Sequence, residues 1–285
     1  LSWRGYLMPP STWDLVKRVA FTTSYYRTTT KSHKKGDAKI SKVKSVVACP
    51  IPPNVEYVVP TLHPSSIMRT GFKSVPVLAY DTERAWRAAN GTLNLLDFSY
   101  DSYPTNLTGD KESITVDIET SWSPGGTNNF INRVGMANNA GAWSAAWSVG
   151  CRDRCRAELG DVLNRTIVGH NLCFDIPELE EAGVKCVGPL FDTMLAAQML
   201  QPDILKGLNG VASLYLDVER WKHLSDKQPE KYNAHDAIST HYLYGVLKQA
   251  LKEQGVYDHF AGHIMPALRV LMDMEREGLR VDEAG

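Results

Sequence analysis

The segment Ser113-Ile114-Thr115-Val116-Asp117-Ile118-Glu119-Thr120 places two carboxylates inside an apolar, β-branched run. Its alternation and β-branched side chains predict a strand. In a strand, side chains two positions apart point to the same face, so Asp117 and Glu119 share one site. Carboxylates inside an apolar strand are unfavourable unless a cation or hydrogen-bond donors pair with them. A divalent cation is the simplest group that offsets their mutual repulsion, so the segment predicts a metal site.

The pattern on the C-terminal side of this strand predicts an α/β fold. Two further strands at 131–137 and 142–149 flank a hairpin signal, Asn138-Asn139-Ala140-Gly141. A helix at 152–164, a short buried strand at 166–169, a helix at 172–182 and a short strand at 184–187 follow. Helices then dominate, at about 191–200, 208–216, 230–253 and 259–277. Such an order predicts an α/β domain with a mixed sheet flanked by helices.

A second acidic motif, Gly169-His170-Asn171-Leu172-Cys173-Phe174-Asp175, lies where the short strand meets the next helix. Asn171 is a plausible N-cap of that helix. Asp175 falls in the first helical turn, where the helix dipole favours a carboxylate. Each residue therefore has a structural interpretation of its own. The pattern N-x-x-x-F-D nevertheless occurs only here in the chain.

The third motif, Tyr232-Asn233-Ala234-His235-Asp236, lies in the long helix that opens after Pro229. Tyr232 and Asp236 are four positions apart, so they share a helix face. No other Y-x-x-x-D occurs in the chain. His235 is one position off that face, and we expect it in solvent rather than as a ligand.

The three motifs, in this order, resemble those of the DEDDy branch of the DnaQ-like 3′–5′ exonucleases, which have a ribonuclease-H-like fold. Phe191-Asp192-Thr193-Met194-Leu195 and Lys206-Gly207-Leu208 also look like segments of that family. The tail, Ile264–Leu268 and 274–282, resembles the helix that leads into the polymerase of family A (polymerase I-like) DNA polymerases. The resemblance is therefore closest to their proofreading domain. Its motifs cover about residues 111–255.

The resemblance implies hydrolysis of the 3′-terminal phosphodiester of DNA with two divalent cations, Mg²⁺ or Mn²⁺, releasing nucleoside monophosphates. It implies that Asp117 bridges both cations, that Glu119 and Asp236 complete the tight site, and that Asp175 serves the second cation. It further implies that Tyr232 orients the attacking water. The implied contacts to the terminal nucleotide are Thr120, Asn171 and Phe174.

Other functions share these residues or parts of them. A ribonuclease-D-like RNA 3′–5′ exonuclease would use the same five residues, although such enzymes usually carry a helical domain instead of a polymerase-entry helix. A degenerate exonuclease fold could serve as a non-catalytic DNA-binding scaffold. The presence of all four carboxylates argues against that alternative.

The N-terminal part is predicted to be a separate unit. We expect a partial domain at 1–96, a linker at 97–111, the exonuclease domain at 112–255 and a helix toward a polymerase domain at 256–285. Trp3-Arg4-Gly5 and residues 58–69 resemble the C-terminal half of a uracil-DNA glycosylase-superfamily domain, in which the His63 loop would contact DNA. The half with the water-activating motif is absent, so we expect no glycosylase activity. A basic DNA-contacting appendage is the alternative.

Composition and charge complete these expectations. The 285 residues carry a net charge of −1, but residues 1–50 hold ten Lys/Arg and two acidic residues. A basic arm thus precedes an acidic body, and the arm suits phosphate contacts. Five scattered cysteines make a poor disulfide framework, and no leader is visible, so we expect a cytoplasmic protein from a bacterial or viral replication context. The expected partners are a single-stranded DNA 3′ end, with RNA as the alternative, and a polymerase domain in the same parent chain. We expect no membrane partner.

Overall fold

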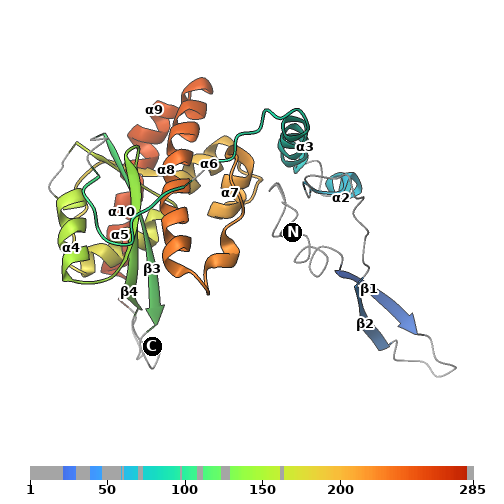
Figure 1. Cartoon of the computed structure of the whole chain (residues 1–285), viewed down its shortest axis with the longest axis horizontal. Coiled ribbons are helices and arrows are strands. Elements are labelled where there is room, and N and C mark those ends of the chain that lie inside the picture. The colour runs from blue at the N-terminus through green and yellow to red at the C-terminus, as the bar shows by residue number, and fades with distance from the viewer. Residues whose placement is uncertain are drawn as a thin grey trace.

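A five-stranded mixed sheet, surrounded by helices, forms the centre of residues 112–280 (Figure 1). The computed structural model describes residues 22–29, 39–46, 59, 61–69, 73–96, 98–107, 112–122, 129–160 and 164–280. The strand order is β5-β4-β3-β6-β7. The strands are β3 (Ser113–Trp122), β4 (Asn129–Asn138), β5 (Gly141–Ala146), β6 (Thr166–Gly169) and β7 (Leu190–Asp192). Strands β3, β4 and β5 are antiparallel, whereas β6 and β7 run parallel to β3, so the predicted mixed sheet is confirmed.

Helices cover both faces of this sheet. They are α4 (Val149–Cys155), the π-helix η2 (Arg156–Gly160), α5 (Leu172–Glu181), α6 (Thr193–Leu200), α7 (Leu208–Tyr215), the 3₁₀ turn η3 (Lys222–Leu224), α8 (Pro229–Glu253), α9 (Tyr257–His259), the π-helix η4 (Phe260–Ile264) and α10 (Met265–Glu277). None of the described helices has the length and apolar character needed to span a bilayer. The four cysteines in the described ranges have free thiols.

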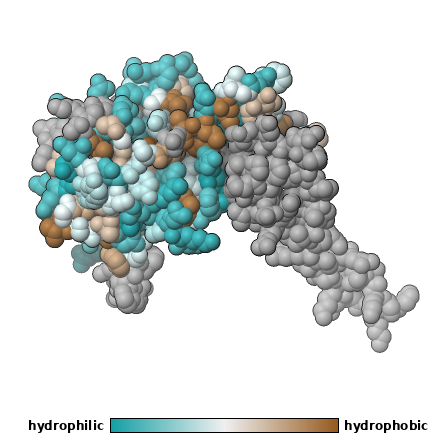
Figure 2. All heavy atoms as spheres, viewed as in Figure 1, coloured by the Kyte–Doolittle hydropathy of each residue, from teal (hydrophilic) through white to brown (hydrophobic). Residues whose placement is uncertain are grey.

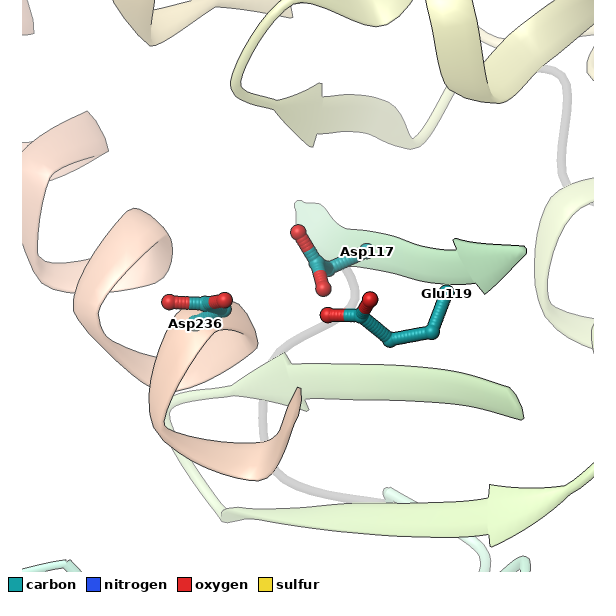
Figure 3. Close-up of side chains that lie close together, drawn as sticks. All are labelled: Asp117, Glu119 and Asp236. Carbon is teal, nitrogen blue, oxygen red and sulfur yellow. The ribbon is translucent and has the colours of Figure 1, made fainter. Parts of the chain in front are cut away.

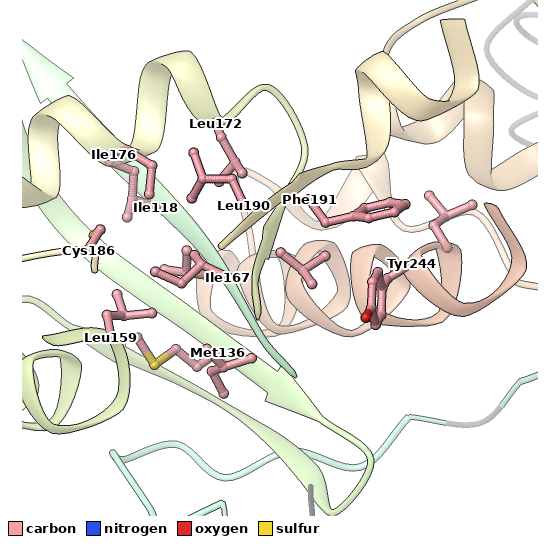
Figure 4. Close-up of a cluster of buried hydrophobic side chains, with 14 of the residues drawn as sticks. Ile118, Met136, Leu159, Ile167, Leu172, Ile176, Cys186, Leu190, Phe191 and Tyr244 are labelled. Carbon is pink, nitrogen blue, oxygen red and sulfur yellow. The ribbon is translucent and has the colours of Figure 1, made fainter. Parts of the chain in front are cut away.

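The two faces of β3 have different roles. Helix α8 packs on the face that carries Thr115 and Asp117, where the Thr115 hydroxyl lies 3.2 Å from Nδ1 of His241. Because side chains alternate along a strand, Ile118 points to the opposite face. There it joins the main hydrophobic core with Leu159 and Ile176 (Figure 4). One face of the strand is therefore core, and the other holds the carboxylates.

The prediction of a strand at 184–187 is wrong. The last strand of the sheet is instead Leu190–Asp192, although the sequence predicts a helix from about residue 191. Val184 bonds back to the carbonyl of Leu179, so it closes the end of α5 and pairs with no strand. The chain reaches β6 only at Gly188, where an added Cβ would lie 2.0 Å from the carbonyl oxygen of Arg165. This close approach, rather than local propensity, decides where pairing begins.

The described residues of the N-terminal part form a two-stranded antiparallel sheet and two helices. The strands are β1 (Thr22–Thr29) and β2 (Lys39–Val46), and the helices are α2 (Pro64–Arg69) and α3 (Val75–Ala89). Helix α3 begins six residues earlier than the predicted 81–90, because Pro76 fits the first helical turn. Helix α2 begins directly after His63. Trp3-Arg4-Gly5 and most of 55–60 lie outside the described residues, so the glycosylase-like resemblance stays a prediction.

The predicted linker follows the edge of the sheet. Asp101 pairs with β5, accepting from the Ser144 amide at 3.0 Å and donating to the Ala142 carbonyl at 2.9 Å. Leu107 is buried, and its carbonyl accepts from the side chain of Asn138. Residues 98–107 therefore pack on the domain they precede, while the predicted domain boundaries stay predictions.

On the face drawn in Figure 2, the described residues are mainly hydrophilic, with hydrophobic residues in small groups.

Gly135 permits the close approach of α8 to the sheet. It lies on β4 opposite Asp117. A Cβ added there would lie 2.8 Å from Oδ1 and 2.9 Å from the carbonyl oxygen of Asn233 on α8. Both distances are shorter than a Cβ tolerates, so the glycine is required by packing.

We predict that Gly135→Ala lowers the free energy of unfolding by about 1–3 kcal/mol, because overpacking pushes α8 away from the sheet. Urea denaturation measures this. Gly245→Ala is the matched control, since that glycine is exposed on α8 and has no atom within 4 Å of an added Cβ. The control should raise stability by about 0.5–1 kcal/mol. Equal effects of the two substitutions would contradict the packing argument.

Candidate active site

Three predicted carboxylates meet between the sheet and α8. Asp117 and Glu119 project from β3, and Asp236 projects from α8 toward them (Figure 3). One carboxylate oxygen from each lies within 4.8 Å of the others. The β3–β4 register shifts between Glu119 and Thr120, which is an irregularity of the kind that re-aims side chains beside active sites.

Asp175 lies next to this group without belonging to it. It stands in the first turn of α5, is 5% exposed, and accepts a 2.9 Å hydrogen bond from the backbone amide of Ile118 through Oδ1. Ile118 is the residue between Asp117 and Glu119. The second motif is therefore bonded to the strand that carries the first.

Burial and mutual repulsion make these groups hard to ionise together. Burial raises the pKa of Asp117 well above its ordinary value, and the charges of Asp236, Asp175 and Glu119 raise it further. Burial likewise raises the pKa of Asp175 to about 8 and that of Asp236 to about 7. The pKa of Glu119 is raised by burial, although Lys222 and Arg133 oppose this.

This donor set fits divalent cations. Mg²⁺ and Mn²⁺ prefer oxygen ligands, and three carboxylate oxygens converge here on one point. Like charges held this close favour a cation between them. Asp117, Glu119 and Asp236 would hold such a cation, and Asp175 stands beside them.

Trp221 and Lys222, which sequence reasoning missed, hold the third motif in place. The buried Trp221 donates from Nε1 to Oδ1 of Asp236 at 2.6 Å. Lys222 donates from Nζ to the phenolic oxygen of Tyr232 at 3.2 Å. Burial and the nearby charge of Asp236 raise the pKa of Tyr232, so its hydroxyl stays protonated at neutral pH. Trp221 and Lys222 therefore orient two predicted catalytic groups, although neither residue is part of a sequence motif.

A cavity of about 280 Å³ opens beside these groups. Its lining consists of Leu205, Gly207, Leu208, Asn209, Gly210, Lys222, Tyr232 and Asp236. The first residues of α7 thus face the tyrosine and one carboxylate across a solvent-accessible space.

Asn233 is a third residue that sequence reasoning missed. It is fully buried, and its Nδ2 donates to Oδ2 of Asp117 at 2.7 Å and to the Asp117 carbonyl at 3.1 Å. Its Oδ1 accepts from the hydroxyl of Ser144 at 2.7 Å. The residue after Tyr232 therefore fixes the orientation of the Asp117 carboxylate from the helix that packs on the same face of the sheet. The only sequence signal was its place inside the third motif.

The predicted substrate contacts do not line the cavity of about 280 Å³, and Phe174 lines a different cavity with Met272 of α10. Asn171 and Phe174 are exposed, and Thr120 is half-buried. Asn171 has a left-handed backbone, with φ of 74°, and its side chain caps nothing, so the N-cap interpretation holds for its position only. The cap comes from Asp192, whose carboxylate accepts from the amides of Asn171 and Leu172. A non-glycine residue held in this region marks local strain, which often accompanies a functional site.

The expectation that His235 is solvated is wrong. Its ring is half-buried, with Phe98 edge-on at 4.9 Å and Trp221 stacked at 6.1 Å between ring centroids. The segment before the domain supplies Phe98, a contact that no helical pattern reveals. His235 therefore packs behind the residue that orients Asp236.

We predict that stability without divalent cations falls as pH rises. An unfolded aspartate titrates near ~3.9, and folding raises the pKa of Asp175 to about 8. Between these values the folded state holds a proton that the unfolded state has released. The free energy of unfolding therefore falls by up to ~1.4 kcal/mol per pH unit for this group.

Urea denaturation in chelator at pH 5, 6.5 and 8 measures this slope. Asp175→Asn should flatten it, because the amide does not titrate in this range. Asp153→Asn, at an exposed site on α4, should keep the parent slope. A parent slope in the Asp175 variant would contradict the assignment.

Comparison with known proteins places these features in a family. Residues 108–252 match the family model described as 3′–5′ exonuclease, in its family A DNA polymerase form. DNA polymerase I of Borreliella burgdorferi is 28% identical over 132 residues, which is 42% of this chain and 14% of that protein. DNA polymerase I of Treponema pallidum is 32% identical over 129 residues, or 40% of this chain and 13% of that protein. The match thus spans about a seventh of each curated relative.

Solved structures share the fold. Brucella melitensis NrnC bound to pGG aligns with a TM-score of 0.51 and 22% identity, over 67% of this chain and 98% of that one. The POL domain of Pol1 from M. smegmatis, in complex with DNA primer-template and dNTP, aligns with a TM-score of 0.52 and 17% identity, over 65% of this chain and 33% of that one. The predicted ribonuclease-H-like α/β fold is confirmed. The chain belongs to the 3′–5′ exonuclease family, as a hydrolase domain of the DNA polymerase I type.

Proposed function

We propose that this chain removes nucleotides from the 3′ end of single-stranded DNA with two divalent cations, Mg²⁺ or Mn²⁺. The observation that carries the proposal is the convergence of Asp117, Glu119 and Asp236 on one point. Membership of the exonuclease family and the similarity to DNA polymerase I support it. Bound cations would neutralise charge on the scissile phosphate and lower the pKa of the attacking water.

The protein's own residues position the reactants in this proposal. Asp117, Glu119 and Asp236 would hold the cations, and Asp175 would serve the second of them. Tyr232, anchored by Lys222 at 3.2 Å, orients the attacking water. A protonated phenol cannot accept the water's proton as a phenolate would, so positioning is its role.

The terminal nucleotide of the substrate would be held by Phe174, Asn171 and Thr120. The exposed ring of Phe174 can stack on the terminal base, because stacking on aromatic side chains binds single strands without regard to sequence. Asn171 and Thr120 would make the polar contacts. A module of a longer proofreading polymerase, cytoplasmic and in a bacterial or viral setting, is the context we propose, since the curated relatives are about seven times longer than the matched region.

A ribonuclease-D-like RNA exonuclease remains the second candidate. The same carboxylates would serve it, and a neighbour in fold was solved with pGG. Oligonucleotides of DNA and RNA with one sequence separate the two candidates.

We predict that the chain shortens 5′-labelled single-stranded DNA stepwise in Mg²⁺ or Mn²⁺, and that chelator stops it. Asp117→Ala should abolish the ladder, because this carboxylate is common to the proposed cation sites. Asp153→Ala, at an exposed carboxylate on α4, should digest like the parent. A full ladder from the Asp117 variant would refute the assignment, and digestion of RNA alone would favour the second candidate.

We predict that Tyr232→Phe reduces kcat by about tenfold to about a hundredfold, because a misplaced reactant has effects of that size. The ring stays, and only the hydroxyl that bonds Lys222 is lost. Tyr242→Phe on the same helix, at a ring that contacts Phe98, should retain parent kcat. Single-turnover rates measure both, and an unchanged rate for the Tyr232 variant would remove its proposed role.

A further inference from the structure

Helix α3 lies outside the matched residues 108–252 and outside the predicted exonuclease domain, yet a buried arginine joins it to the nuclease. Arg84 is 6% exposed. Its guanidinium donates to the carbonyls of Ser213 and Leu216, the latter at 2.8 Å, and lies 3.4 Å from Oδ1 of Asp217.

Two of these acceptors are carbonyls of the C-terminal end of α7, in its last turn and at its C-cap Leu216. The last carbonyls of a helix have no intrahelical partner and carry the negative end of its dipole. A guanidinium satisfies several of them at once, and burial strengthens such bonds. Arg84 is therefore a C-terminal cap for α7, supplied from a distant part of the chain. Arg87, one turn on, bonds Oδ2 of Asp217 at 2.5 Å.

Apolar contacts extend this attachment to the other end of the same segment. Val77 of α3 forms a buried cluster with Ile204 and Leu214. The rings of Tyr80 and Tyr215 lie 5.8 Å apart. At the surface, Lys73 pairs with Asp203 at 3.0 Å. Helix α3 thus contacts residues 203–217 at both ends.

The middle of residues 203–217 is one wall of the cavity beside the carboxylates. Leu205, Gly207, Leu208, Asn209 and Gly210 line it, opposite Lys222, Tyr232 and Asp236. Within the family domain, Val211, Ala212 and Leu216 of this segment pack in the main core and α7 contacts α6 and α8. Nε2 of His170 also lies 2.8 Å from the Lys206 carbonyl. Helix α3 adds a support from outside the matched residues.

We propose that Arg84 is a positioning residue for the exonuclease site, and that α3 is a working part of the nuclease because it fixes the 203–217 wall. The proposal rests on the proposed function for its kinetic readout. In this proposal Arg84 does not contact the substrate. Loosening the wall weakens substrate binding while the carboxylates stay in place, since these project from β3 and α8 and not from the wall itself.

The test compares Arg84→Ala with Arg84→Lys, Arg87→Ala and the control Glu83→Ala, which alters an exposed residue of the same helix. The substrate is whichever DNA or RNA oligonucleotide the parent degrades. For Arg84→Ala we expect KM to rise by about tenfold with a smaller change in kcat, the signature of lost binding. Arg84→Lys should recover part of the loss, Arg87→Ala should shift KM less, and Glu83→Ala should match the parent.

Hydrogen exchange gives a readout that needs no activity. Amides of residues 203–217 should exchange faster in the Arg84→Ala and Arg87→Ala variants, while those of β3 should not change. Parent KM and parent exchange in both variants would overturn the proposal. If Arg84→Ala does not fold, Arg87→Ala at its half-exposed site decides the question. If the parent degrades no nucleic acid, the proposed function fails, and exchange alone still tests whether α3 fixes the wall.

Discussion

Repulsion between carboxylates is the constraint around which this molecule is built. Asp117, Glu119 and Asp236 hold oxygens within 4.8 Å of one another, and Asp175 adds its charge from α5. Such a cluster is stable only if donors are placed before any cation arrives. The fold supplies them from three directions: Asn233 for Asp117, Trp221 for Asp236, and the Ile118 amide for Asp175.

Each donor requires an accurate contact between distant elements. Asn233 reaches Asp117 because Gly135 lets α8 approach β4 more closely than any side chain would allow. Asp175 reaches Ile118 because Asp192 fixes the start of α5. The same Asp192 carboxylate also accepts from Met194 and Leu195 at the start of α6. One buried acidic side chain therefore caps two helices and sets the position of Asp175, the carboxylate of the second motif.

Residues outside the family match also contact the elements that hold the site together. Phe98 packs on His235 behind Trp221, and α3 caps α7 through Arg84. Phe98 contacts the residue directly before Asp236, and α3 contacts the helix that lines the cavity beside the carboxylates. A nuclease domain truncated to the matched residues 108–252 would lose both contacts, because Phe98 and Arg84 lie before residue 108.

Short-range pattern in the sequence was enough to identify the first strand, the common face of Asp117 and Glu119, the helix shared by Tyr232 and Asp236, and the mixed sheet. The strand, the common face and the shared helix follow from periodicities of two and of about four residues, which depend only on neighbours along the chain. The mixed sheet follows from the order of the predicted elements. Trp221, Lys222, Arg84, the two-helix cap of Asp192 and the strand at Leu190–Asp192 came only from the tertiary structure. Each of these depends on a contact between segments far apart in sequence, where the energy is set by distance and burial in three dimensions. No local pattern records such a distance, so the sequence determined which groups carry the chemistry, and the packing decided what holds them in place.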